Sequence, residues 1–300
     1  MADSWRSRSR HLHLEDQVVD DPVAVEINVD AALLLKTLVG IDSYPPVLAL
    51  LPNIYRIEDR DRVHEVVAAQ LTDAGVLLDD GRVHPVVERW LQCLYRPDVE
   101  LAVRIVDTGL DGEPRGMLRL SLVRSGLDHV LAVRNDDHVV IQSVFQQDED
   151  LDILAGAIVS ALGSAPAASL EPWQVSSAQL SAVAAEFGES AEPAELRRAF
   201  VELGAPPRTA AVLERALDEV FRRAEVLVLE HHDGEYPRPE VCLSVLDTVS
   251  GRLVVSPSVA MDGELWSTYQ PGDDAAIRSG IIALINLLPG RSWFETSRIS

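Results

Sequence analysis

Histidines, acidic pairs and cysteines are the residues of this sequence whose types and spacing allow chemistry. His231-His232 is the closest pair of potential metal ligands, because neutral imidazole binds zinc well. Neighbouring residues at a strand end point to opposite faces, so a shared metal is geometrically unfavourable and solvated loop histidines are expected. His11 and His13 would share one face of an extended segment, but they lie in an N-terminal stretch without periodicity. The histidines therefore predict no metal site.

Acidic pairs and thiols lead to the same expectation. Asp79-Asp80 and Asp136-Asp137 stand at short turns, where carboxylates bond to nearby backbone more often than they bind calcium. Cys93 and Cys242 are the only cysteines, and both fall in apolar patterns that indicate buried thiols. The sequence contains no P-loop, GxGxxG, GxSxG or EF-hand pattern. We expect no catalytic residues, no metal and no cofactor, although scattered residues can still assemble an unfamiliar active site.

The charge of the chain excludes two classes of partner. Its 300 residues carry a formal net charge of -22 and are 47% hydrophobic. Nucleic acid and anionic membrane surfaces would both repel such a chain, since each is bound through basic patches. The longest apolar runs fall short of the roughly 20 residues of a membrane span, and no apolar segment follows the N-terminal arginines as in a secretory signal. A cytoplasmic globular protein is expected.

Alternating apolar residues predict a four-strand antiparallel meander between Pro97 and Phe145. Apolar side chains at every second position, as from Val99 to Ile105, are typical of strands with one covered face. The pattern returns roughly 125 residues later, with Ser125-Gly126 set against Ser250-Gly251, and such recurrence indicates a duplicated unit. A helix with acidic residues in its first turn closes each copy. We predict an α+β fold whose central antiparallel sheet has two quasi-symmetric halves and is flanked by helical bundles.

Composition divides the chain into four segments. Residues 1–20 mix Ser, Arg, His and acidic residues without periodicity and are expected to be disordered. Residues 21–165 form the N-terminal half, in which Asp30 is expected to cap a helix after a short strand. Residues 166–175 hold two prolines and small residues and suggest a surface linker. Residues 176–295 form the C-terminal half, and the two halves are expected to make one unit.

Several short segments carry a further signal: Ser43 to Leu48, Arg96 to Leu101 and, above all, Arg252 to Ser258 with Asp262 to Ser267 and Tyr269 to Gly272. They resemble the EspG family, the ESX secretion-associated proteins of actinobacterial type VII secretion. The order of these short segments carries the resemblance, which extends from about Val23 to Trp293. It implies a cytosolic, non-enzymatic chaperone that binds the hydrophobic helical tip of PE/PPE-like secretion substrates before export.

The resemblance also implies where such a partner is bound. The family's contacts involve the sheet, the loop between the first two meander strands and the second helical bundle. That loop is 108–115 here, and its candidate contacts are Leu110, Glu113 and Arg115. The candidates on the sheet, placed on a face by alternation alone, are Arg104, Ser256, Trp266 and Thr268.

Two alternatives remain open at this level. The first is an enzyme or ligand-binding protein with a pocket between the halves, which requires a concave site with converging polar groups. The second is a homodimer or larger self-assembly formed by pairing of sheet edges. The arginine-bearing N-terminal tail and His231-His232 receive no role from the resemblance.

Overall fold

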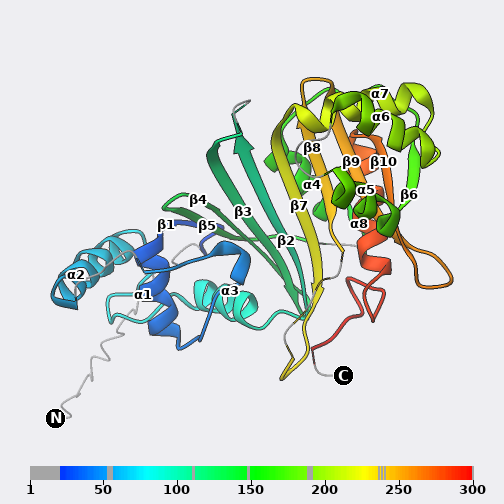
Figure 1. Cartoon of the computed structure of the whole chain (residues 1–300). Helices are drawn as coiled ribbons and strands as arrows, with labels where there is room; N and C mark the ends of the chain where they lie inside the picture. The colour runs from blue at the N-terminus through cyan, green and yellow to red at the C-terminus, as the bar shows by residue number, and fades with distance from the viewer. Residues whose placement is uncertain are drawn as a thin grey trace, which may run out of the picture.

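The described residues form one antiparallel sheet with helices on both of its sides (Figure 1). The computed structural model describes residues 21–52, 57–109, 112–146, 149–187, 192–235, 237, 239 and 241–298, with side chains of helix α2 from residue 61 onwards. The N-terminal half contains β1 (Ala24–Asn28), α1 (Val29–Val39), the short 3-10 helix η1 (Pro46–Leu48), α2 (Ile57–Asp73), α3 (Pro85–Tyr95), β2 (Val99–Thr108), β3 (Pro114–Ser125), β4 (Asp128–Asn135), β5 (His138–Ser143) and α4 (Asp152–Leu162). The C-terminal half contains β6 (Trp173–Ser176), α5 (Ser177–Phe187), α6 (Pro193–Glu202), α7 (Pro207–Asp218), β7 (Val220–Glu230), β8 (Leu243–Thr248), β9 (Gly251–Val259), β10 (Leu265–Pro271) and α8 (Asp274–Asn286).

The strands follow the same order from either edge of the sheet. The order is β1-β5-β4-β3-β2-β7-β8-β9-β10-β6, so β2 and β7 meet at the centre and each is followed outward by its own meander. The β2–β7 pair is antiparallel, from Val99–Glu230 to Asp107–Arg222, as a two-fold relation between the halves requires. The predicted α+β fold of two quasi-symmetric halves is confirmed.

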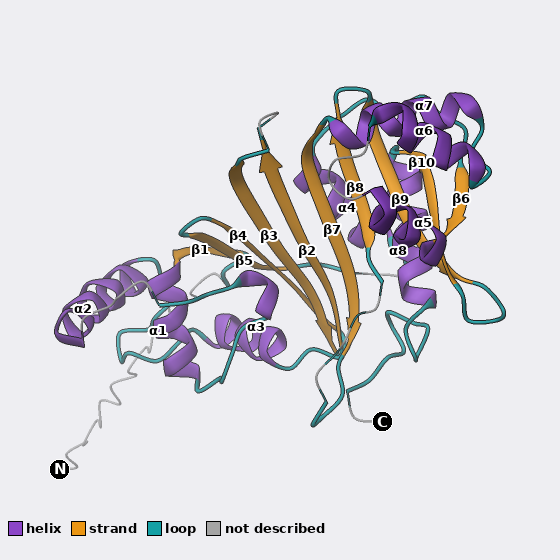
Figure 2. Ribbon diagram, in the orientation of Figure 1, coloured by secondary structure: helices purple, strands orange, loops and turns teal. Residues whose placement is uncertain are grey.

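The two faces of the sheet are covered differently. One face, which we call the closed face, carries Leu101, Val226 and Val254 and packs against α4 and α8 in a shared apolar core. The other, which we call the open face, carries Ala102, Arg104 and Leu227, because side chains alternate along each strand. Figure 2 places α1–α3 at one end of the sheet and α5–α7 at the other, with β2 and β7 between the two bundles.

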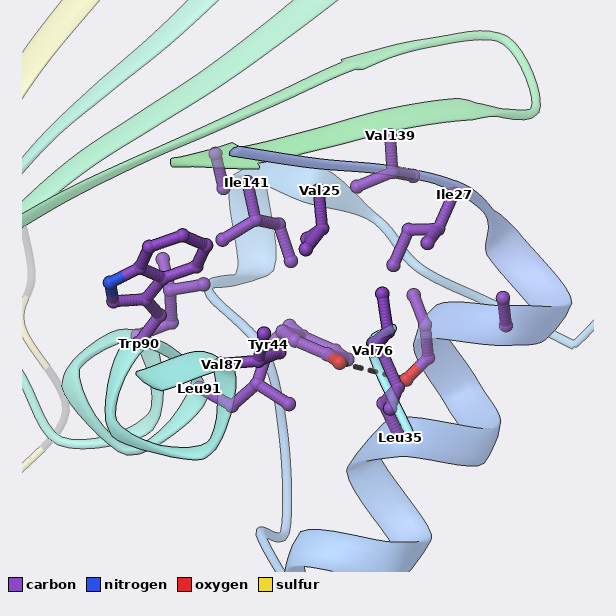
Figure 3. Close-up of a cluster of buried hydrophobic side chains, with 14 of the residues drawn as sticks. Val25, Ile27, Leu35, Tyr44, Val76, Val87, Trp90, Leu91, Val139 and Ile141 are labelled. Atoms are coloured by element: carbon purple, nitrogen blue, oxygen red, sulfur yellow. Dashed lines mark hydrogen bonds between the residues drawn. The ribbon is translucent and has the colours of Figure 1, made fainter. Parts of the chain in front are cut away.

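Tyr44 fixes the segment between α1 and η1. Its hydroxyl donates to the carbonyl oxygen of Ala32 at 2.7 Å, and its ring lies among apolar side chains of α1, α3 and the sheet (Figure 3). Burial raises the pKa of Tyr44, so the hydroxyl remains a donor. Arg134 donates to the carbonyls of Leu48, at 2.9 Å, and of Ala49. Together these bonds hold η1 and its neighbours beside β2.

Residues 166–175, expected to be a linker, contain part of a strand instead. Trp173–Ser176 forms β6, which pairs with β10 and occupies the edge opposite β1. Trp173 and Val175 are buried on either side of exposed Gln174, and the Trp173 ring stacks on Tyr269 with 5.6 Å between centroids. The alternation covers only four residues, which hides the strand in a segment rich in Pro and Ser.

The residues of the two halves that occupy equivalent positions are not the ones that the sequence suggests. The β3–β4 hairpin closes with the pair Ser125–Asp128, and the β8–β9 hairpin closes with Thr248–Gly251. Ser125 therefore corresponds to Thr248, and Gly251 belongs to a strand rather than to the turn. Gly251 has φ +110°, and a Cβ there would lie 2.8 Å from the backbone nitrogen of Ala168. Glycine is required because the segment before β6 runs along β9.

Each half holds the segment that leaves the closing helix of the other half. In the C-terminal half, Arg252 donates to the carbonyl of Gly163, just beyond α4, at 3.0 Å. Its guanidinium also contacts the Asp247 carboxylate at 2.6 and 3.0 Å, and both residues are buried. In return, residues of the N-terminal half hold the chain beyond α8.

Arg124 and His129 make these contacts. We call the hydrogen bonds of Arg252 and Asp247 the C-terminal grip, and those of Arg124 and His129 the N-terminal grip. Arg124 donates to the carbonyls of Trp293, at 2.6 Å, and of Thr296. The indole nitrogen of Trp293 donates to Nε2 of His129 at 3.1 Å, and both side chains are buried. The two grips are reciprocal, so the halves interlock in one unit.

Two further expectations change at the level of single residues, and a third is met. Asn28, not Asp30, caps α1, since its side chain accepts from the backbone nitrogen of Ala31 at 2.8 Å. Cys93 is buried as expected, whereas Cys242 is exposed and lies just before β8 rather than in a strand. Asp80 bonds to the backbone and side chain of Arg82, which is the turn role expected for it. Over the described part of the chain, no helix has the length and apolar character that crossing a membrane demands.

Candidate partner-binding groove

A groove of about 900 Å³ lies on the open face of the central strands. Its floor is formed by β2, β3 and β7, and one wall by Asp42–Ala49 with the end of α3. The β7–β8 connection and the C-terminal segment bound its end. The wall is rigid because Tyr44 and Arg134 fix it from behind.

Part of the groove floor is apolar and uncovered. Leu227 and Leu229 are half-buried on the open face, and among the described residues neither belongs to an apolar core cluster. Ala102 lies between them and the N-terminal wall and leaves a shallow surface. Leucine side chains left at a concave surface without partners favour binding of another apolar group.

A chain of polar groups crosses one end of the floor. Glu100 is buried and accepts a hydrogen bond from the Ser121 hydroxyl at 2.8 Å, while its other oxygen lies 3.2 Å from Nε2 of His231. The carboxylate thus stands between the hydroxyl and the imidazole. A serine nucleophile needs the imidazole next to its hydroxyl, so this order satisfies a buried charge and does not activate Ser121.

The two adjacent histidines are each bonded to a different carboxylate. His231 faces Glu100, and Nε2 of His232 lies 3.0 Å from Glu230. Neither is a solvated loop residue, which corrects that expectation: His231 and His232 are only partly exposed. Within the described ranges, no cluster of three His, Cys, Asp or Glu side chains is arranged to hold a metal ion.

Ion pairs close the end of the groove near the C-terminus. Asp233 accepts from Arg298 at 2.6 Å and from Arg96 at 2.8 Å. The hydrogen bond from Arg298 is the main cause that lowers the pKa of Asp233, with both guanidinium charges adding to it. Nearby, the Tyr95 hydroxyl donates to the Asp42 carboxylate at 2.5 Å, which raises the pKa of Tyr95. These exposed contacts position this end of the groove and contribute little to the free energy of unfolding.

The residues predicted to bind a partner fall into three groups. Arg104 lies in the groove, where it pairs with Glu225. Glu113 and Arg115 are exposed at the β2–β3 hairpin, and Leu110 lies outside the described residues. The half-buried residues Ser256, Trp266 and Thr268 lie elsewhere.

Strand register puts this third group on the closed face. Ser256 pairs with Thr268 and follows Val254 by two residues, so both face the side of α4 and α8. Arg104, in contrast, shares its cross-strand row with Glu225, Ser244 and Val255. The structure therefore separates Arg104 from the other three sheet candidates. Alternation within one strand cannot relate the faces of distant strands without the register.

The most informative groove residues were not singled out from the sequence. Arg119, Leu227 and Leu229 line the groove beside Arg104. Arg119 is the direct partner of Arg104 across β2 and β3, and that pairing was the signal that could have identified it. The wall around Tyr44 and Pro45 appeared in the sequence only as part of a family resemblance.

Known proteins are similar to this chain over nearly its whole length. The model of the EspG family matches residues 28–282. The ESX-1 secretion-associated protein EspG1 of Mycobacterium marinum is 32% identical over 277 residues, which are 92% of each chain. The ESX-3 secretion-associated protein EspG3 of Mycolicibacterium smegmatis is 30% identical over 273 residues, which are 91% of this chain and 90% of that protein.

A solved structure has the same fold. It is that of the Mycobacterium tuberculosis type VII secretion system chaperone EspG5 in complex with a PE25-PPE41 dimer. The match has a TM-score of 0.76 at 20% sequence identity and covers 91% of this chain and 100% of the other.

Proposed function

The chain belongs to the EspG family, and from this premise we propose that it is a cytoplasmic chaperone of type VII secretion. It binds the hydrophobic helical tip of a PE/PPE-like substrate, keeps that substrate soluble and delivers it for export. The structural relative EspG5 is a chaperone in complex with a PE25-PPE41 dimer, and we extend this class of partner to the present chain.

The uncovered apolar floor of the groove is the observation that carries the proposal. Leu227 and Leu229 belong to β7, which lies between the two helical bundles, and pack in none of the apolar cores of the described residues. An exposed helical tip with apolar side chains aggregates in water, and a concave apolar sheet can shield it. A stable complex of this kind buries on the order of 1,200 to 2,000 Å² in total, so the contact extends beyond the groove.

Arg104 and the β2–β3 hairpin are the contacts that fit this arrangement. Arg104 lines the groove, and the hairpin that carries Glu113 and Arg115 extends two of the strands that form its floor. Ser256, Trp266 and Thr268 lie on the closed face, so a single tip on the open face does not reach them. Trp266→Ala therefore tests which face binds the partner. It weakens binding by about 2 kcal/mol only if Trp266 is an anchor of the interface.

Binding without turnover is part of the proposal. The groove lies between the halves, as an enzyme or ligand-binding alternative would require, but its polar chain satisfies Glu100 rather than activating Ser121. The apolar part of the floor, with Ala102, Leu227 and Leu229, offers area for a protein surface.

Co-expression with PE/PPE-like dimers encoded in the same genome tests the function. We expect one dimer to remain soluble only with this chain and to elute with it as a complex of defined mass by light scattering, which also detects self-association. Leu227→Asp places a charge in the apolar floor and is expected to weaken binding at least about 100-fold, since burying an unpaired charge costs several kcal/mol.

The matched control is Leu127→Asp. Leu127 is 97% exposed in the β3–β4 turn, so the same substitution there leaves both folding and binding unchanged. Equal solubility of every dimer with and without this chain, and no complex with any of them, would show that the proposed function is wrong.

A further inference from the structure

Three arginines form a row across the open face of the N-terminal half. Arg104 on β2 pairs directly with Arg119 on β3, and Arg119 pairs directly with Arg134 on β4. Side chains that oppose each other across antiparallel strands are about 4.5–5.5 Å apart at Cβ, and like charges there are unfavourable. A row of three guanidinium groups is thus a feature that the fold alone does not favour.

The three arginines differ in what they contact. Arg134 donates to the carbonyls of Leu48 and Ala49 and so holds the groove wall. Arg104 pairs with the carboxylate of Glu225. The side chain of Arg119 forms no hydrogen bond or ion pair with any described residue. One carboxylate therefore faces three guanidinium groups.

Arg119 is also partly desolvated. Burial, followed by the charges of Arg134 and Arg104, lowers the pKa of Arg119 from its usual value. Its charged form is therefore less stable here than in water. An anion bound at the row would offset both the burial of the guanidinium and the repulsion between the arginines. A carboxylate suits the site, because an arginine fork accepts it in two parallel hydrogen bonds.

The surroundings of the row indicate the source of the carboxylate. Arg119 and Arg104 line the same groove as the apolar floor of Ala102 and Leu227. The net charge of -22 disfavours nucleic acid as the occupant. A carboxylate carried by the partner beside its apolar tip would therefore meet the row in the same groove.

We propose that the arginine row, through Arg119, recognises an Asp or Glu side chain next to the apolar tip of the helical partner. This inference rests on the proposed function and adds to it a charge requirement on the partner. Chaperones and substrates encoded in one genome are then matched by charge as well as by apolar fit.

Arg119→Gln and Arg119→Glu test the inference against the PE/PPE-like dimer that binds the wild-type chain. We expect a Kd about tenfold higher for Arg119→Gln and a larger loss for Arg119→Glu, which places a second carboxylate opposite the first. The affinity of Arg119→Gln also depends less on salt concentration. Reversing the partner's tip carboxylate to Arg restores binding to Arg119→Glu.

The controls separate folding, charge and function. Arg62→Gln, on exposed α2, makes the same change in net charge outside the groove and leaves Kd unchanged. The Tm of free Arg119→Gln is equal to or above that of the wild type, because no bond is lost and repulsion is relieved.

Two outcomes would overturn the inference. If Arg119→Gln binds the dimer as tightly as Arg62→Gln does, the row does not recognise the partner, while the chaperone function stands. If the free chain binds inorganic phosphate through Arg119 and affinity for the dimer is unchanged in the variant, the row is a site for a free anion. Failure of the wild-type chain to bind any dimer is a different result, because it contradicts the proposed function itself.

Discussion

The two halves of the sheet share a topology but differ on the open face. In the C-terminal half, α5–α7 cover the outer strands and bury Leu246, Leu253 and Tyr269. In the N-terminal half, the helical bundle reaches β1, β4 and β5 but only Val123 of β3. The central strands β2 and β7 both face the groove, but β3 adds Arg119 to it whereas β8 buries Leu246 against the helices.

The charges of the open face follow the same division. In the register set by the two hairpins, Arg104, Arg119 and Arg134 correspond to Leu227, Cys242 and Pro257. The buried grips on the closing helices, by contrast, occur in both halves. Equivalent positions of the two halves thus have similar roles where they hold the halves together. They differ where they face the open side of the sheet.

The buried arginine pairs give the largest expected effect and the first test of this comparison. Arg252→Met leaves Asp247, 3% exposed, without its close partner, which is expected to lower the free energy of unfolding by about 3–5 kcal/mol. Arg124→Met costs less, because Asp98 keeps hydrogen bonds from the backbone of Gly126 and Arg298.

Urea unfolding measures both losses. The double variant Arg252→Met/Asp247→Leu is the control, since removing both charges recovers much of the stability. Equal losses for Arg252→Met and Arg124→Met would contradict the view that the C-terminal grip is the more deeply buried of the two.

The hairpin glycines give the next largest difference. Gly126 has φ +58° with no atom within 4 Å of a Cβ, so Gly126→Ala costs about 1–2 kcal/mol of left-handed strain. Gly251 combines φ +110° with backbone atoms at 2.8–2.9 Å, so Gly251→Ala costs about 3 kcal/mol or more. Thermal unfolding of the two variants tests this order. A smaller shift for Gly251→Ala would mean that the segment before β6 is not held against β9.

The repeated strands could be predicted from the sequence because each carries enough alternating residues to indicate one covered face. The same signal is too short in β6, where Trp173 and Val175 are the only buried apolar alternation. The hairpin register was misjudged because Ser-Gly occurs near both turns, although only Gly126 lies in one. Short sequence patterns therefore did not show which residues form the edges of the sheet or how the two halves align.

The groove was harder to predict than the fold. Of the sheet residues predicted to bind a partner, Arg104 lies in the groove, whereas Ser256, Trp266 and Thr268 lie on the other face. Whether a residue lies on the open or the closed face depends on pairing through five strands, and a single slip reverses the answer. Arg119 required the β2–β3 register, which the long hairpin loop does not specify.

The buried tryptophans of the two ends provide a smaller and more selective test. Trp293→Phe removes the hydrogen bond to His129 and is expected to cost about 1–3 kcal/mol. Trp173 is the matched control, because its Nε1 is buried without a partner among the described residues. Trp173→Phe changes the free energy of unfolding by less than about 1 kcal/mol, since loss of an unsatisfied donor offsets the smaller ring. Similar losses for both would indicate that ring volume, not the hydrogen bond, holds the C-terminal segment.

Acid is expected to loosen only the grip that the N-terminal half makes. Burial is the main cause that lowers the pKa of His129; Arg124 lowers it further, while the Leu127 carbonyl and Asp128 raise it. The neutral ring accepts the indole hydrogen of Trp293 through Nε2, whereas the unfolded chain takes up a proton near pH 6.5.

The His129 contribution to stability is therefore fully present above about pH 6.5 and is lost as pH falls toward the lower folded pKa. Arg252, at the corresponding position of the C-terminal half, keeps its charge throughout this range. His129→Gln retains an acceptor but does not titrate, so its urea midpoint falls less than that of the wild type between pH 7.5 and about pH 5.5. If the two proteins lose stability in parallel, His129 is not the acid-sensitive element, and carboxylates shared by both halves account for the loss.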